Sequence, residues 1–183
     1  MAVTINGTTG ISTPALASAG AISAAGALSA ASEVFTAQPV VTTPQSMIWL
    51  NNANANGTTN TLVPRFANVV VNQGTDITYT DSVTLGSSFT INTTGVYSIS
   101  ASVATAGAGN WMGITLNGNP LTAIISQTAA TLLNVGYQIT AGATIQSNST
   151  AFLVAGSIIR LGFQSVPAYA SYTMSTFQIT KVS

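Results

Sequence analysis

The side chains that could perform chemistry are few, and their spacing does not bring them together. The 183 residues contain no His and no Cys, and the charged residues are Glu33, Arg65, Asp76, Asp81, Arg160 and Lys181. Catalysis needs a poised proton carrier or an activated nucleophile, and the many Ser and Thr hydroxyls have no His to activate them. Asp76 and Asp81 flank a strand-like stretch, which places them on opposite faces rather than in a carboxylate pair. We therefore expect a protein that is not an enzyme and that holds no cofactor.

The charge balance favours burial of surface between copies of the chain. The formal net charge is zero, while 46% of the residues are hydrophobic and the mean hydropathy is +0.46. A soluble monomer usually keeps its net charge away from zero, so we expect a homo-oligomer. Three scattered cations cannot neutralise a row of phosphates, which excludes nucleic acid as a partner. Residues 14–31 are too poor in large apolar side chains for a membrane span, and no Lys or Arg precedes them as in an export signal.

A repeat of six residues marks the first 46 positions, a segment that we interpret as an anchor or shaft. The period matches the strand repeat of two rather than the helix repeat of 3.6, and Gly20 and Gly26 would each weaken a helix by about 1 kcal/mol. Such a short repeat cannot bury its apolar positions alone, so several chains would wind together. An Ala-rich helix and a disordered segment are the alternatives. The repeat positions are Leu16, Ile22, Leu28 and Val34, with Ile5 and Ile11 six apart but one residue out of phase.

The remaining chain reads as a linker followed by many short strands. Residues 47–64 are predicted to be a linker with one short strand at Met47–Leu50 and an Asn-rich loop over 51–60. Residues 65–183 are rich in Thr, Val, Ile and Ser, as β-structure prefers, and predict an antiparallel sandwich or jelly roll. The expected strands are 65–71, 88–92, 96–105, 111–116, 121–126, 132–139, 151–154, 158–164 and 172–182.

Alternation within these strands assigns core residues, and two turns stand out. Ile159, Leu161 and Phe163 face one way and Arg160 the other, while Tyr97 alternates with serines. We expect Arg160 to face outward, or to pair with an acid across a subunit interface. Asn117-Gly118 predicts a two-residue hairpin, and residues 92–95 predict a second tight turn.

The aromatic residues allow two interpretations. Aromatic rings offer broad contact surfaces on which sugars can stack, but the same rings are ordinary constituents of a jelly-roll core or a trimer axis. The residues concerned are Tyr79, Tyr137, Tyr169, Tyr172, Trp49 and Trp111. If a receptor site exists, we expect it in the loops 106–110 and 165–171, which are small and flanked by aromatic residues. The candidate receptor residues are Asn110, Trp111, Tyr169 and Tyr172.

Four motifs in order resemble the C1q/TNF-like superfamily over about residues 59–183. They are the block Phe89–Ser100 with Gly95 and Tyr97, the strand and Asn-rich turn 112–118, the stretch 149–161, and the aromatic final strand 172–179. Ser157 stands where the family usually has an acidic residue. The resemblance implies a jelly roll that forms a homotrimer around an apolar axis, with Phe89, Tyr97, Ile159, Leu161, Phe163 and Phe177 as core or trimer residues. Some members hold calcium, but this region has only Asp76 and Asp81, too few ligands for a hard cation.

The amino-terminal stretch 2–16 is similar to the opening of many tailed-bacteriophage fibre-like proteins, in which such segments attach to the virion. Together, the two resemblances imply a virion protein with an amino-terminal anchor and a trimeric knob. We expect a tail fibre or tail appendage whose partners are other virion proteins and a host-surface glycan or protein. The alternatives are a capsid decoration or head-fibre protein, and a secreted C1q-like binding module. The expected location is the virion, on the tail or the capsid surface.

Overall fold

The computed structural model describes residues 45–183, apart from the side chains of Asn54 and of residues 170–173. Nearly all of the expected anchor or shaft lies outside these residues, so its assignment stays a prediction. The six repeat positions that fall there are Ile5, Ile11, Leu16, Ile22, Leu28 and Val34.

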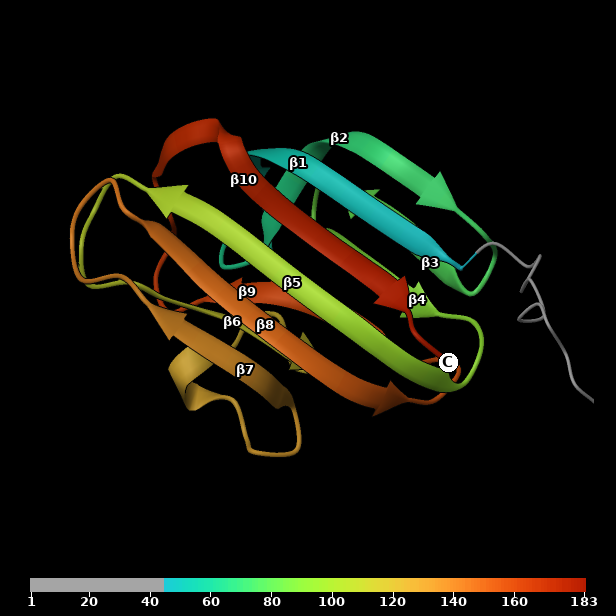
Figure 1. Cartoon of the computed structure of the whole chain (residues 1–183). Coiled ribbons are helices and arrows are strands. Elements are labelled where there is room, and N and C mark those ends of the chain that lie inside the picture. Colours follow the sequence, from blue (N-terminus) through green and yellow to red (C-terminus); the bar gives the residue numbers. More distant parts are fainter. Residues whose placement is uncertain (1–44) are drawn as a thin grey trace, which may run out of the picture. The chain divides into compact units, whose positions relative to one another are not determined.

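Two five-stranded antiparallel sheets pack face to face and form a jelly roll (Figure 1). The first sheet has the order β2 (Pro64–Gln73), β1 (Met47–Asn56), β10 (Tyr169–Lys181), β5 (Gly95–Thr105) and β8 (Thr144–Leu153). The second has the order β3 (Ile77–Ser82), β4 (Gly86–Ile91), β9 (Ile158–Phe163), β6 (Trp111–Leu116) and β7 (Leu132–Tyr137). The predicted all-β fold class is confirmed.

The core lies between the sheets and is built from alternating strand positions. In β5, Tyr97, Ile99 and Val103 are buried and the intervening serines face away. Phe177 of the first sheet stacks against Phe89 of the second, with ring centroids 4.5 Å apart. The six predicted core residues are each at most 1% exposed: Phe89, Tyr97, Ile159, Leu161, Phe163 and Phe177.

Residues 51–56, predicted as a loop, instead complete strand β1. Asn and Ala have low strand propensity, but β1 is hydrogen-bonded on both sides, to β2 and to β10. The described pairing with β10 covers Met47–Asn51, and the pairing with β2 continues to Asn56 and outweighs local preference. The Asn68 amide also donates to Asn51 Oδ1 at 2.8 Å. The sandwich therefore begins at Met47, inside the segment that the sequence predicted as a linker.

The strand predicted at 121–126 and the hairpin predicted at Asn117-Gly118 are wrong. Asn117 does turn the chain, with φ of +52°, but a loop with the 3-10 turn η1 (Ile124–Ser126) follows before β7. Both edges of β6 are already paired, with β7 and β9, so no third strand can join there. Ile124 instead packs on the outer face of the second sheet, over the paired Gly113 and Gly162.

Polar sequences explain why one strand was not predicted and another was predicted too short. Strand β3 was not predicted, and β8 begins at Thr144 rather than at residue 151. Both are edge strands with a solvent-facing side, so polar residues such as Gln146 and Asn148 are tolerated there. The predicted turn at 92–95 does not make a hairpin within one sheet, because it carries the chain from β4 to β5 in the other sheet.

Candidate functional site

The two loops predicted to hold a receptor site come together at one end of the sandwich. Ala106 N donates to Ala168 O at 2.6 Å, and the side chain of Asn110 exchanges hydrogen bonds of 3.3 Å with the backbone of Ser165. A small cavity of about 140 Å³ lies between them, lined by Thr105, Gly107, Ala108, Asn110, Ser165, Val166 and Ala168. Asn110 is only 7% exposed, so its amide fixes the loops rather than facing solvent.

A buried glutamine that sequence reasoning missed supports this end. Gln138 is 1% exposed, and its amide donates to Thr105 O at 2.9 Å and to Ala143 O at 2.8 Å. The Thr105 hydroxyl donates to Gln138 Oε1. These bonds join the β7–β8 connection to the end of β5 and hold the loops in place, because a buried amide needs all of its partners. No sequence pattern marks Gln138, whose partner Thr105 lies 33 residues away.

The aromatic receptor candidates have separate environments. Trp111 stacks on Tyr137, with ring centroids 4.5 Å apart, on the outer face of the second sheet. Tyr169 points its hydroxyl to β1, where it donates to Ala55 O at 3.2 Å and to Asn56 Oδ1. The side chain of Tyr172 lies outside the described residues. Trp111 and Tyr169 therefore do not form one aromatic surface.

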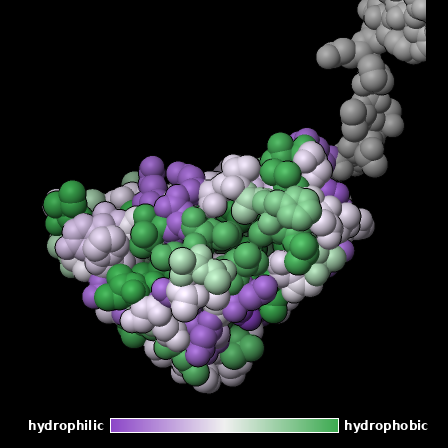
Figure 2. Space-filling model, turned by 90° about the horizontal axis from the view of Figure 1, so that it is seen from below, coloured by the Kyte–Doolittle hydropathy of each residue, from purple (hydrophilic) through white to green (hydrophobic). Residues whose placement is uncertain are grey.

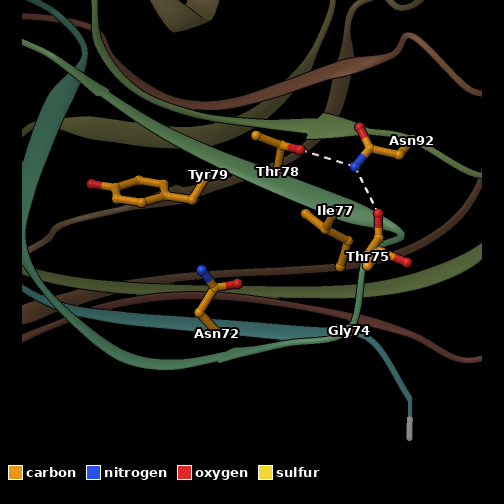
Figure 3. Close-up of a pocket in the computed structure, with 7 residues that line it drawn as sticks. All are labelled: Asn72, Gly74, Thr75, Ile77, Thr78, Tyr79 and Asn92. Carbon is orange, nitrogen blue, oxygen red and sulfur yellow. Dashed lines mark hydrogen bonds between the residues drawn. The ribbon is translucent and has the colours of Figure 1, made fainter. Parts of the chain in front are cut away.

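A larger concave site lies at the opposite end, between the edge strands β2 and β3 (Figure 3). It has a volume of about 350 Å³ and is here called the Tyr79 pocket; its lining residues are Asn72, Gly74, Thr75, Ile77, Thr78, Tyr79 and Asn92. Gly74, with φ of +79°, lies so close to Ser46 that a Cβ would stand 2.1 Å from the serine Oγ. The turn from β2 to β3 therefore packs against the beginning of the described chain.

Some polar groups of the Tyr79 pocket are hydrogen-bonded within the protein, and others are available to a ligand. Asn92 Nδ2 donates to Thr75 O at 2.7 Å and to Thr78 Oγ1 at 2.9 Å, which fixes the amide across the pocket (Figure 3). Asn72 is exposed and lies across the pocket from this pair. The pocket combines these neutral groups with the buried side chain of Ile77, which is 5% exposed.

Tyr79 forms a fixed wall of the pocket. Its hydroxyl donates to Phe66 O at 2.9 Å and lies 2.9 Å from Ser87 Oγ, and its ring packs near Phe89 with centroids 6.0 Å apart. Burial raises the pKa of Tyr79 to about 12, so the hydroxyl keeps its proton at any physiological pH. Tyr79 was among the aromatic residues that could stack on a sugar, but its place in a pocket was not predicted, because the strand Ile77–Ser82 was not predicted.

An ion pair next to the pocket ties the ends of the described chain together. Asp76 Oδ2 accepts from the Ser46 hydroxyl at 2.6 Å and Oδ1 accepts from Lys181 Nζ at 3.1 Å. Hydrogen bonds from Ser46, Thr93 and Lys181 lower the pKa of Asp76 to about 2. The carboxylate is thus ionised over the whole range in which proteins normally work.

The two aspartates belong to different ion pairs. Asp81 accepts a two-pronged bond from Arg65, with N–O distances of 2.9 and 2.7 Å, far along β3 from the pair of Asp76. Arg160 faces outward on β9; burial lowers its pKa, and its Nε has no hydrogen-bond partner within residues 45–183. In that same part of the chain, no three acidic, His or Cys side chains gather as a metal site would require. The described helices also include none long and apolar enough to cross a membrane.

The outer face of the first sheet carries rows of uncharged side chains across four adjacent strands. One cross-strand row runs Trp49, Gln178, Ser100, Asn148, and parallel rows continue it on both sides. These residues alternate with core positions, so their side chains point away from the other sheet. The parallel rows are Met47, Thr180, Ser98, Thr150 and Asn51, Thr176, Ser102, Gln146.

A second uncovered surface is apolar and lies along the side where β7 and β8 meet. Figure 2 views the molecule from this side and shows hydrophobic residues gathered in the middle of the face. The large apolar side chains exposed on β7 and on the preceding loop are Leu121, Ile125 and Tyr137, with exposed fractions of 48–58%. Half-buried Leu132 and Val135 continue the surface along β7, while Leu133 packs against the core. Phe152 of β8 is 67% exposed and shares the outer face of the first sheet with Thr150.

Comparison with known proteins identifies the fold but no family. No family model matches the sequence, and no curated protein matches it. Crystal structures of murine APRIL at pH 8.0 and pH 5.0 are similar, each with a TM-score of 0.53 at 15% and 14% identity, covering 76% of this chain and 100% of that chain. A third, at pH 8.5, has a TM-score of 0.52 at 16% identity, with the same coverage. At this identity the likeness concerns the fold alone, and the described chain is a jelly roll of the TNF-like type.

Proposed function

We propose that this chain is a non-enzymatic, homotrimeric protein of a tailed-phage virion, with a binding knob at residues 47–183. In this proposal the amino-terminal segment anchors the protein and the knob contacts the host surface. The TNF-like fold supports a binding module, and the fibre-like stretch 2–16 supports attachment to a virion. The scarcity of charged and nucleophilic groups supports a role in assembly and recognition rather than in catalysis.

The observation that carries the trimer is the presence of two unlike uncovered surfaces. The outer face of the first sheet carries rows of uncharged side chains, and the β7–β8 side is apolar. Contact between two different surfaces of the same chain is heterologous, and such contacts close into a ring when the rotation permits. Each copy would then lay its apolar side on the neutral face of the next, which buries both surfaces. A ring of three copies agrees with the resemblance to C1q/TNF-like domains.

The assembly is tested by measuring the mass of the full-length protein with light scattering after size exclusion. We expect three chains for the wild type and fewer for Ser100→Asp, because Ser100 lies in the middle of the neutral face and a buried unpaired carboxylate is costly. The matched control is Ser88→Asp on the outer side of β4 in the other sheet, which should remain trimeric. A monomeric wild type, or an unaffected Ser100→Asp variant, would contradict the proposal.

The location is tested by electron microscopy of virions labelled with gold-tagged antibody against residues 59–183. Label on the tail supports host adsorption by the knob, whereas label over the head favours the capsid-decoration alternative. Deletion of residues 1–46 should leave a soluble trimer that no longer joins the particle. Normal incorporation of the truncated protein would contradict the role of that segment as an anchor.

A further inference from the structure

We propose that the Tyr79 pocket binds a neutral pyranose sugar unit, such as a hexose of a cell-surface glycan. This inference rests on the proposed role of the domain as a binding knob and names the ligand class. It also moves the binding site from the predicted loops 106–110 and 165–171 to the opposite end of the sandwich.

Size favours this pocket over the cavity between the predicted loops. Pockets that hold small organic ligands usually have volumes of about 300–1,000 Å³. The Tyr79 pocket, at about 350 Å³, reaches this range, whereas the loop cavity, at about 140 Å³, does not. The larger site is an open cleft, so one sugar unit can enter while the rest of a glycan extends into solvent.

The available hydrogen-bonding groups match sugar hydroxyls, which both donate and accept. The Asn72 amide has no hydrogen-bond partner among the described residues, so it offers a donor and an acceptor. Asn92 uses its two N–H groups internally, which leaves Oδ1 as an acceptor. The Thr78 hydroxyl accepts from Asn92 and keeps its own proton free to donate. These groups stand on different sides of one cleft, as Figure 3 shows.

The apolar part of the pocket matches the C–H surface of a pyranose ring. Tyr79 contributes an aromatic ring, and two hydroxyl contacts at 2.9 Å hold that ring in place. Ile77 adds a buried aliphatic surface beside it. A ring held before the ligand arrives loses little conformational entropy on binding, which favours affinity at a shallow site.

The charge of the surroundings selects against acidic sugars. All of the residues that line the pocket are neutral. The nearest charged side chain along the chain is Asp76, which follows Thr75 and whose positive partner Lys181 is already engaged. A carboxylate or phosphate in the pocket would thus have no free cation to pair with and would meet a like charge.

The test is saturation-transfer NMR on the full-length protein with glucose, galactose, mannose and N-acetylglucosamine, and with N-acetylneuraminic acid as the acidic comparison. We expect transfer to at least one neutral sugar and none to the acidic one. Asn72→Ala should weaken binding about fivefold or more, the effect of losing one or two hydrogen bonds. The matched control is Gln73→Ala, the next residue of β2, whose side chain points to the other side of the strand. Val166→Ala alters the loop cavity and should also leave binding unchanged.

The outcomes separate this inference from the proposed function. Absence of transfer to all four neutral sugars overturns the sugar site, and so does binding that Asn72→Ala leaves intact. Loss of binding in Val166→Ala instead of Asn72→Ala would place the site in the predicted loops. If the protein forms trimers on the virion and yet binds no neutral sugar, the proposed function stands and only the pocket assignment fails.

Discussion

The two sides of the sandwich are closed by different means. On the β7–β8 side the backbones meet, because Gly136 lies so close to Gln146 that a Cβ would stand 2.2 Å from its carbonyl oxygen. On the β2–β3 side the edges are held by side chains, through the Arg65–Asp81 pair and the Tyr79 hydroxyl on Phe66 O. The first side is sealed and carries an apolar surface, whereas the second is bridged and contains the pocket.

Under the proposed function, this difference would separate assembly from recognition within one fold. The sealed side is held by backbone contact, to which the Asn134 amide adds a hydrogen bond to Asn148 O, and it carries the apolar surface. A side bridged by side chains leaves space between the bridges, and functional sites favour such concave regions between elements. The ion pair and the neighbouring hydrogen bonds also occupy the β2 and β3 edges, which discourages edge-to-edge pairing.

The largest loss of stability is expected on the sealed side, when Gly136 receives a side chain. Gly136→Ala places a Cβ against the backbone of β8, which cannot move aside as a flexible side chain can. We expect a loss of about 3 kcal/mol in the free energy of unfolding, measured by urea denaturation. The control is Gly107→Ala, where a Cβ would have no atom within 4 Å. Equal stability of the two variants would mean that the sides do not differ as described.

A substitution on the bridged side should lower the free energy of unfolding less, because it removes only hydrogen bonds. Tyr79→Phe keeps the aromatic ring but removes the donor to Phe66 O and the contact with the buried Ser87. We expect a loss of about 1–2 kcal/mol in the same measurement. Tyr137→Phe is the matched control on the sealed side, where the hydroxyl group is more exposed, and it should change stability little. A larger loss for Tyr137→Phe would reverse the proposed contrast.

Acid should break the ion pair and hydrogen bonds that Asp76 makes beside the pocket. Asp76 has a folded-state pKa of about 2, below its ordinary value of 3.8, so its stabilising effect is complete above pH 4 and is lost as the pH falls towards 2. We expect a loss of about 1–2 kcal/mol over that interval, followed as a lower thermal midpoint. The Asp76→Asn variant should lose less stability than the wild type over the same pH interval. If the variant loses as much as the wild type, other carboxylates control acid stability.

The sequence predicted those parts of the fold in which large apolar residues alternate. Phe89, Tyr97 and Ile159 could be assigned to the core because strand periodicity and burial agree there. The end of β1 was missed, because its pairing with β2 imposes a conformation that its Asn and Ala residues do not favour. Gly136 gave no signal either, since its role depends on a backbone that approaches from β8.

The binding regions were predictable only in part. The loops 106–110 and 165–168, each predicted as a possible receptor loop, lie together, yet Asn110 and Tyr169 are used to hold structure. The Tyr79 pocket combines residues from 72–79 with Asn92, and no motif connects them in the sequence. The pocket lies between the edge strands of two different sheets, and one of them, β3, was not predicted.

The position of β1 also determines how the domain would carry a mechanical load. Ser46 precedes a strand that is hydrogen-bonded on both sides, and its carbonyl accepts from Lys181 at 2.9 Å near the other end of the chain. A force applied at Ser46, while the loops at the far end of the domain are held in place, would act along β1. It would stress the bonds to β2 and β10 in shear, all at once, instead of opening them one after another. The ladder to β2, which overrides the weak strand propensity of residues 51–56, and the ladder to β10 would together make this strand the part that bears tension.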